Sequence, residues 1–184
     1  NDINYTLEVN LDDAFIGRLV SISLNRRRED GNIGLERLRV RIPKGVENGS
    51  KIRLAGKGEP GYNGGPSGDL YIVVKIRPHP LFERKGDNLY VKLSVTFSEA
   101  ALGARVVAPT LEGETKMTVP EGTQSGQTFR LRGKGMPHLK GNGQGDLYVT
   151  AHVVVPKDLS DESKALIREL ERMNPANPRE EVRT

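Results

Sequence analysis

The stretch RLAGKGEPGYNGGPSGDLYIVV, residues 53–74, returns later in the chain as RLRGKGMPHLKGNGQGDLYVTA, residues 130–151. The offset between the copies is 77 residues, as from Arg53 to Arg130. Upstream the offset becomes 86, as from Ala14 to Ala100, so the first copy carries nine more residues between these blocks. A fixed offset of this kind indicates repeated structural units. The sequence therefore predicts a tandem duplication with a loop insertion in the first copy, near residues 26–36.

The repeated stretch also has the glycine pattern of a nucleotide-binding loop, at Gly56, Gly58 and Gly61. Such a loop requires a helix directly after the glycines, because the helix N-terminus must meet a phosphate. Here prolines and further glycines fill the following residues and exclude a helix. In the second copy His138 takes the place of the third glycine. We therefore interpret both stretches as turns between strands and expect no cofactor.

Apolar and polar residues alternate along much of the chain, which is typical of strands with one buried face. The alternation is clearest at residues 5–9, 20–24, 38–42, 89–95 and 117–119. A short helical stretch lies between the first two strands of each copy. Asp12 and Ser98 are its predicted N-caps, and Gly17 and Gly103 its predicted ends.

These patterns predict a mainly β fold of two tandem β-sandwich-like domains, arising by internal duplication and followed by a C-terminal helix. We place the domains at residues 1–80 and 81–156, sizes that can fold alone, and the helix and tail at residues 157–184. Asp158 or Ser160 can cap this helix. A single helix cannot bury its own apolar stripe, so it packs on the second domain or against a partner chain. The stripe consists of Leu166, Leu170 and Met173.

The composition excludes several classes of function. The 184 residues contain no Cys and only three scattered His, so neither a disulfide nor a metal site is expected. No apolar run approaches the roughly 20 residues that span a bilayer, so we expect no membrane contact. No nucleophile with an orienting base is recognisable. We therefore expect a cytoplasmic protein that is not an enzyme.

The formal net charge of +4 makes nucleic acid a candidate partner. Lys and Arg alternate with acidic residues almost everywhere, however, whereas a nucleic-acid site requires a clustered basic face. The only run of three, Arg26, Arg27 and Arg28, is followed at once by two acids. We interpret this run as part of a solvated loop.

The repeated blocks resemble the C-terminal substrate-binding region of DnaJ-type (J-domain) co-chaperones. The resemblance covers about residues 1–173 and rests on IPKGVENGSKIRLAGKGEPG (42–61), HPLFERKGDNLY (79–90) and VPEGTQSGQTFRLRGKGMP (119–137). It implies two β domains and a C-terminal dimerisation helix in a splayed homodimer. The function that it implies is to hold unfolded client polypeptides and deliver them to a DnaK-type chaperone.

Two features of that family are not present in this sequence. The J-domain signature His-Pro-Asp does not occur, since His79-Pro80 is followed by Leu81. The Cys-x-x-Cys module of the zinc-containing class is missing too, and a short Arg-rich segment, residues 26–37, occupies its neighbourhood. The resemblance is therefore to the zinc-free class without its J-domain. That class includes curved-DNA-binding relatives in bacteria, so a curved-DNA-binding module remains the alternative function.

The resemblance also places a client peptide in a shallow apolar groove on the first domain. Residues two apart on a strand share a face, so they can line one surface. Periodicity alone describes the same residues equally well as core, and both interpretations stay open. In zinc-free relatives the groove also takes the acidic tail of the partner chaperone. The residues that carry over are Tyr5, Leu7, Ile22, Leu24 and Ile72 for the client, with Arg26, Arg27 and Arg28 for the tail.

Overall fold

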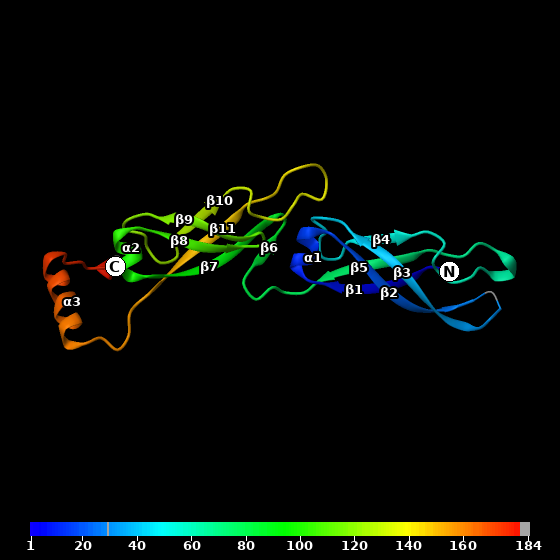
Figure 1. Ribbon diagram of the computed structural model, residues 1–184, viewed down its shortest axis with the longest axis horizontal. Coiled ribbons are helices and arrows are strands. Elements are labelled where there is room, and N and C mark those ends of the chain that lie inside the picture. The colour runs from blue at the N-terminus through cyan, green and yellow to red at the C-terminus, as the bar shows by residue number, and fades with distance from the viewer. Residues whose placement is uncertain (29, 181–184) are drawn as a thin grey trace.

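Figure 1 shows the computed structural model of the chain, which describes residues 1–28 and 30–180. The two repeats lie end to end along the long axis, and the last helix stands beyond the second repeat. Among the described residues, no helix has both the length and the apolar character needed to cross a bilayer.

Apart from β6 and a 3₁₀ turn, the described elements follow one another in the same order in both repeats. The first repeat contains β1 (Ile3–Val9), α1 (Leu11–Ile16), β2 (Arg18–Arg27), β3 (Ile33–Ile42), β4 (Lys51–Leu54), a 3₁₀ turn (Tyr62–Gly64) and β5 (Leu70–Ile76). The second contains β6 (Glu83–Lys85), β7 (Asn88–Thr96), α2 (Phe97–Leu102), β8 (Ala104–Thr110), β9 (Gly113–Val119), β10 (Thr128–Leu131) and β11 (Leu147–Val154). The last helix is α3 (Asp161–Met173).

Each repeat combines a larger sheet with a two-stranded hairpin. In the first repeat β5 lies between β1 and β4, parallel to β1 and antiparallel to β4. In the second, β11 pairs in the same way with β7 and β10, and β6 adds a fourth strand. The hairpins are β2–β3 and β8–β9. The predicted fold class, two mainly β, sandwich-like repeats followed by a C-terminal helix, is confirmed.

Buried side chains alternate along the strands, as the pleat requires. In β3, for example, Leu38, Val40 and Ile42 are buried while the residues between them are exposed. Leu70 of β5 and Leu147 of β11 are fully buried at equivalent positions. Buried residues of both repeats form one contiguous cluster. Apolar packing therefore continues from one repeat into the next.

The nine extra residues of the first repeat lengthen its hairpin. Ten residues of β2 pair with ten of β3, whereas only seven pairs join β8 to β9. The prediction of a solvated loop was wrong for Arg26 and Arg27, which continue β2. The alternation is hidden in the sequence because an arginine, Arg26, occupies an inward position. Its charge is paired there with Glu36 at 3.0 Å.

The N-caps of α1 and α2 lie two residues before the predicted N-caps. Asn10 caps α1 instead of Asp12, and Thr96 caps α2 instead of Ser98. The Thr96 hydroxyl accepts the N–H of Glu99, and the Glu99 carboxylate accepts the N–H of Thr96. This reciprocal pair satisfies two N–H groups at once and fixes where the helix starts.

The repeated glycine loops are turns, as predicted, and each holds a carboxylate of the chain itself. The N–H of Gly56 donates to Asp69 Oδ1 at 2.9 Å, and Arg53 Nε donates to Asp69 Oδ2 at 2.6 Å. The second repeat has the same arrangement around Asp146. The hydrogen bond from Gly56, followed by that from Arg53, lowers the pKa of Asp69 below its ordinary 3.8. The loop therefore already binds an internal anion.

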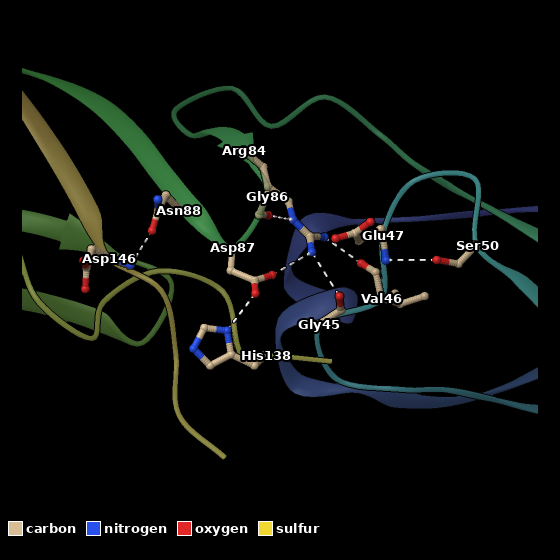
Figure 2. Close-up of polar contacts among 10 residues, drawn as sticks. All are labelled: Gly45, Val46, Glu47, Ser50, Arg84, Gly86, Asp87, Asn88, His138 and Asp146. Atoms are coloured by element: carbon tan, nitrogen blue, oxygen red, sulfur yellow. Dashed lines mark hydrogen bonds and ion pairs between the residues drawn. The ribbon is translucent and has the colours of Figure 1, made fainter. Parts of the chain in front are cut away.

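Arg84, from β6, joins the second repeat to the first. Figure 2 shows its guanidinium donating to the carbonyl oxygens of Val46 at 2.6 Å and Gly45 at 3.0 Å, in the segment after β3. Arg84 also lies 3.7 Å from Asp87, whose other carboxylate oxygen is 2.7 Å from His138 Nδ1. Only 13% of the Arg84 side chain is exposed. Hydrogen bonds from a charged donor are strong and directional, so this contact fixes the junction.

Gly45 is a tight point of the junction. A methyl group there would overlap the carbonyl oxygen of Pro137 and lie 2.8 Å from the nitrogen of Leu139. Its φ of 79° is also one that L-residues rarely adopt. Gly122 holds the equivalent position in the second repeat with the same φ of 79°, but nothing lies within 4 Å of its added methyl. The two glycines thus share the backbone strain, and only Gly45 abuts the other repeat.

We expect Gly45→Ala to destabilise the protein more than Gly122→Ala. Both changes force an L-residue into positive φ, at a cost of about 1–2 kcal/mol. Gly45→Ala must also push the repeats apart, which adds about 1–3 kcal/mol. Denaturant unfolding followed by circular dichroism measures both free energies of unfolding. Equal losses would show that the junction does not contribute to stability.

We expect Asp69 and Asp146 to make the fold sensitive to acid. Their pKa values are lowered in the folded chain, so the stabilisation is complete above the ordinary 3.8 and is lost as pH falls through the lower folded values. Thermal unfolding between about pH 5 and about pH 2 should therefore show a shallower loss of Tm for Asp69→Asn with Asp146→Asn than for the wild type. Asp12→Asn, at an exposed position, controls for the lost charge. An unchanged slope in the double variant would contradict this origin of the pH dependence.

Candidate functional site

The structure brings the five apolar residues predicted to bind a client into one region of the first repeat. Tyr5 and Leu7 lie on β1, Ile22 and Leu24 on β2, and Ile72 on β5. Tyr5 stands directly opposite Ile72 in the strand pairing. All five belong to or pack against the same buried cluster. We call this set the apolar strip.

The members of the apolar strip differ in exposure. Ile72 is 0% exposed, Ile22 4% and Leu7 9%, so these three are core residues. Tyr5 and Leu24 are half-buried and pack against the core from its edge. The interpretation of these positions as core thus describes three side chains, and two others reach the surface.

Two of the three strands that carry the apolar strip, β1 and β2, have a free edge, whereas β5 is central in its sheet. In the sheets of the described residues β1 pairs only with β5, and β2 pairs only with β3. A free edge presents unpaired backbone N–H and C=O groups, which can accept another extended chain. Apolar side chains and backbone donors therefore occur together here.

The second repeat shows which side chains the scaffold itself requires. At the positions equivalent to Tyr5, Ile22 and Leu24 it carries smaller or more polar residues, namely Val91, Ala108 and Thr110. Val91 and Ala108 are buried. The larger apolar side chains of the first repeat are therefore an addition to a fold that forms without them.

The three arginines proposed for the acidic tail have different surroundings. Arg26 donates to Glu36 at 3.0 Å and to the carbonyl oxygens of Gly58 at 3.0 Å and Gly56 at 3.1 Å. The hydrogen bond from Arg26 to Glu36, followed by that from Lys57, lowers the pKa of Glu36. Arg26 thus connects the β2–β3 hairpin to the glycine loop.

Arg27 and Arg28 are exposed, unlike Arg26. Both line a cavity of about 390 Å³ between the hairpin and the glycine loop, together with the Arg26–Glu36 pair and Pro60, so that arginines outnumber acids in its lining. A positively charged cavity beside the free edge of β2 suits an acidic group. The structure therefore leaves these two arginines as the candidates for binding an anion.

The apolar stripe of α3 lies open to solvent. Ser160 caps the helix, as one of the two predicted N-caps, by accepting the N–H of Ser163. None of the residues of α3 is buried, so the helix does not pack on the second repeat. Figure 1 shows it standing off the end of the molecule. The exposed fractions are 66% for Leu166, 43% for Leu170 and 65% for Met173. Ile167, 45% exposed, was not predicted and belongs to the same stripe.

A cleft between the two repeats was also not predicted from the sequence. It has a volume of about 590 Å³ and lies between α1 and residues 137–144. Ile16 from the first repeat and Leu139 from the second line it and are largely exposed. No sequence pattern could reveal this cleft, because it forms only where the two repeats meet.

Comparison with known proteins gives a consistent result. A family model described as "DnaJ C terminal domain" matches residues 3–156. The protein named "Chaperone protein DnaJ" of Ruminiclostridium cellulolyticum is 52% identical over 134 residues, which cover 73% of this chain and 35% of the relative. Its namesake in Halalkalibacterium halodurans is 48% identical over 146 residues, or 79% of this chain and 40% of the relative. In Bacillus cytotoxicus the identity is 53% over 134 residues, with 73% and 37% covered.

The matched region spans well under half of the length of these relatives, between 35% and 40% of each. It contains both repeats and ends just after β11 in the family match. On the strength of that match and of these identities, the chain belongs to the DnaJ C-terminal domain family.

Proposed function

We propose that this chain binds non-native polypeptides as the substrate-binding part of a DnaJ-type co-chaperone and delivers them to a DnaK-type chaperone. Membership of the DnaJ C-terminal domain family supports this role. The observation that carries it is the pair Tyr5 and Leu24, two half-buried side chains of the apolar strip on strands with free edges.

The chemistry of the apolar strip suits an extended client. A polypeptide that adds to a free edge binds through main-chain hydrogen bonds, which any sequence can make. Every second side chain of that polypeptide then faces the strip. In this proposal Leu7, Ile22 and Ile72 form a packed floor, and Tyr5 and Leu24 make the contact. Because this floor is already packed, the contact surface does not have to become ordered each time a client binds.

We assign the binding of the partner chaperone's acidic tail to Arg27 and Arg28 rather than to Arg26. All three arginines line the cavity beside the glycine loop, but Arg27 and Arg28 are exposed, whereas Arg26 is occupied by Glu36 and two carbonyl oxygens. Exposed charges are screened by salt over about 8–10 Å. Binding of an acidic tail should therefore weaken with salt, and binding to the apolar strip should not.

The proposal includes a homodimer formed through α3. A stripe of four exposed apolar side chains on a helix with no buried residue is costly to leave in water. Two copies of α3 can bury this stripe against each other. A dimer carries two apolar strips, so a long client that binds one strip meets the second at high effective concentration.

We expect Leu24→Ser, and separately Tyr5→Ser, to weaken the binding of reduced, carboxymethylated α-lactalbumin, a permanently unfolded protein. The loss should be about fivefold, because about 1 kcal/mol of apolar contact disappears. Fluorescence anisotropy of the labelled client gives the dissociation constants. Binding should persist when NaCl rises to about 0.5 M, since apolar contact is not screened.

Thr6→Ser is the matched control, because Thr6 is exposed on the opposite face of β1 from Tyr5. Tyr5→Ser and Leu24→Ser replace half-buried residues, so circular dichroism must first show that these two variants retain the fold. Wild-type affinity in folded Tyr5→Ser and Leu24→Ser would refute the assignment of the client site to the apolar strip.

We expect Leu166→Ala combined with Leu170→Ala to raise the dimer dissociation constant by at least about tenfold, because large apolar residues dominate such interfaces. Sedimentation equilibrium measures this constant. Arg168→Ala, on the opposite face of α3, should leave it unchanged. A monomeric wild type, or a double variant that dimerises as well as the wild type, would speak against α3 as the interface.

A further inference from the structure

The outer face of the β2–β3 hairpin carries cations and no acids. Its ten residues all point away from the core, and all are exposed. The only acidic residue of the two strands, Glu36, faces inward and pairs with Arg26 and Lys57. The ten outward residues are Leu19, Ser21, Ser23, Asn25 and Arg27 on β2, with Ile33, Leu35, Arg37, Arg39 and Arg41 on β3.

Three arginines form a straight row on this face. Arg37, Arg39 and Arg41 occupy alternate positions of β3, so neighbouring members are about 6.7 Å apart along the strand. None of the three makes an ion pair with another described residue. Small polar side chains, Ser23 and Ser21, stand opposite the first two members. We call the three residues the arginine row.

The fold does not require the arginine row. The second repeat places Glu114, Lys116 and Thr118 at the equivalent positions of β9, with the same outward direction. A strand that forms with either set of side chains does not select arginine for stability. Three like charges side by side instead destabilise the free protein slightly. The arginine row therefore needs an explanation outside folding.

We propose that the arginine row binds an extended, acidic polypeptide segment whose carboxylates occur at every second residue. Such a segment repeats its side chains at the same spacing of about 6.7 Å as the arginines. Guanidinium groups hold carboxylates through paired hydrogen bonds of defined geometry. Each arginine of the row therefore meets one carboxylate of the segment.

Apolar residues at both ends of the row specify the segment further. Leu19 stands opposite Arg41, and Leu35 lies two positions beyond Arg37. Their exposed fractions are 52% and 64%. An acidic segment flanked by apolar residues places apolar side chains against Leu19 and Leu35, whereas a nucleic-acid backbone has no apolar side chain for these two residues. The face also has no aromatic residue on which a base could stack.

This surface lies on the opposite side of the hairpin from the apolar strip, because residues that alternate along β2 point to opposite faces. The inference goes beyond the proposed function and does not depend on it. In these two proposals the arginine row binds the acidic segment through charge, and the apolar strip binds a client through apolar contact. The two sites can therefore be disabled one at a time.

The test uses the labelled peptide Leu-Ser-Glu-Ser-Glu-Ser-Glu-Ser-Leu-Ser-Leu and fluorescence anisotropy. The decisive variant transplants the residues of the second repeat, as Arg37→Glu, Arg39→Lys and Arg41→Thr. It should weaken binding by about tenfold or more, since each exposed ion pair contributes modestly and three act together. The reciprocal variant, Glu114→Arg, Lys116→Arg and Thr118→Arg, should create binding in the second repeat. Both use side chains that the scaffold already tolerates, and circular dichroism verifies the fold.

Three comparisons distinguish the site from its alternatives. The same peptide with Gln in place of Glu should not bind, and raising NaCl from about 0.05 M to about 0.5 M should abolish binding of the acidic peptide. Leu24→Ser should keep wild-type affinity, because it alters the apolar strip on the opposite face of the hairpin. Equal binding of the Gln peptide, or an unaffected transplant variant, overturns the proposal. So does a thymidine oligonucleotide that binds more tightly than the peptide, which would make the row a nucleic-acid surface.

Discussion

The hydrogen bonds from Arg84 to the carbonyl oxygens of Gly45 and Val46 hold the two repeats in one line. The repeats also share apolar packing, but apolar contact is non-directional and does not fix an angle. The directional hydrogen bonds from the nearly buried guanidinium of Arg84 do fix this angle. The apolar strip lies in the first repeat and α3 beyond the second (Figure 1). In the dimer that we propose, the distance between the two strips therefore depends on the angle that Arg84 sets.

The duplication separates what the scaffold needs from what has been added to it. Both repeats keep the same parallel strand pair, the same short helix and the same carboxylate in the glycine loop. They differ at Tyr5 against Val91 and at Arg37 against Glu114, on two faces of the first repeat. Because the scaffold forms with either residue, stability alone does not explain the larger or more charged choice. The differences point to contacts with other molecules.

The sequence predicted what is periodic and missed what depends on contacts between distant segments. Strand alternation and the repeated blocks were sufficient for the fold class and the duplication. The inward position of Arg26 was missed, because its partner Gly58 is 32 residues away. The junction was missed for the same reason, since Arg84 and Val46 are 38 residues apart. The five residues of the apolar strip lie on strands, as predicted, but periodicity could not tell which of them reach the surface.

The lengthened hairpin extends the outer face that carries the arginine row, whereas the row itself stands at positions that the second repeat shares. Extra residues in a strand add to both of its faces, because side chains alternate. The nine added residues, near 27–35, bring Ile33 and Leu35 to the outer face and Arg27 and Arg28 to the cavity beside the glycine loop. Leu24, at the base of this extension, replaces a threonine of the second repeat. One insertion into one hairpin thus adds apolar residues beside the arginine row and arginines beside the glycine loop, which are the two places where we propose that acidic segments bind.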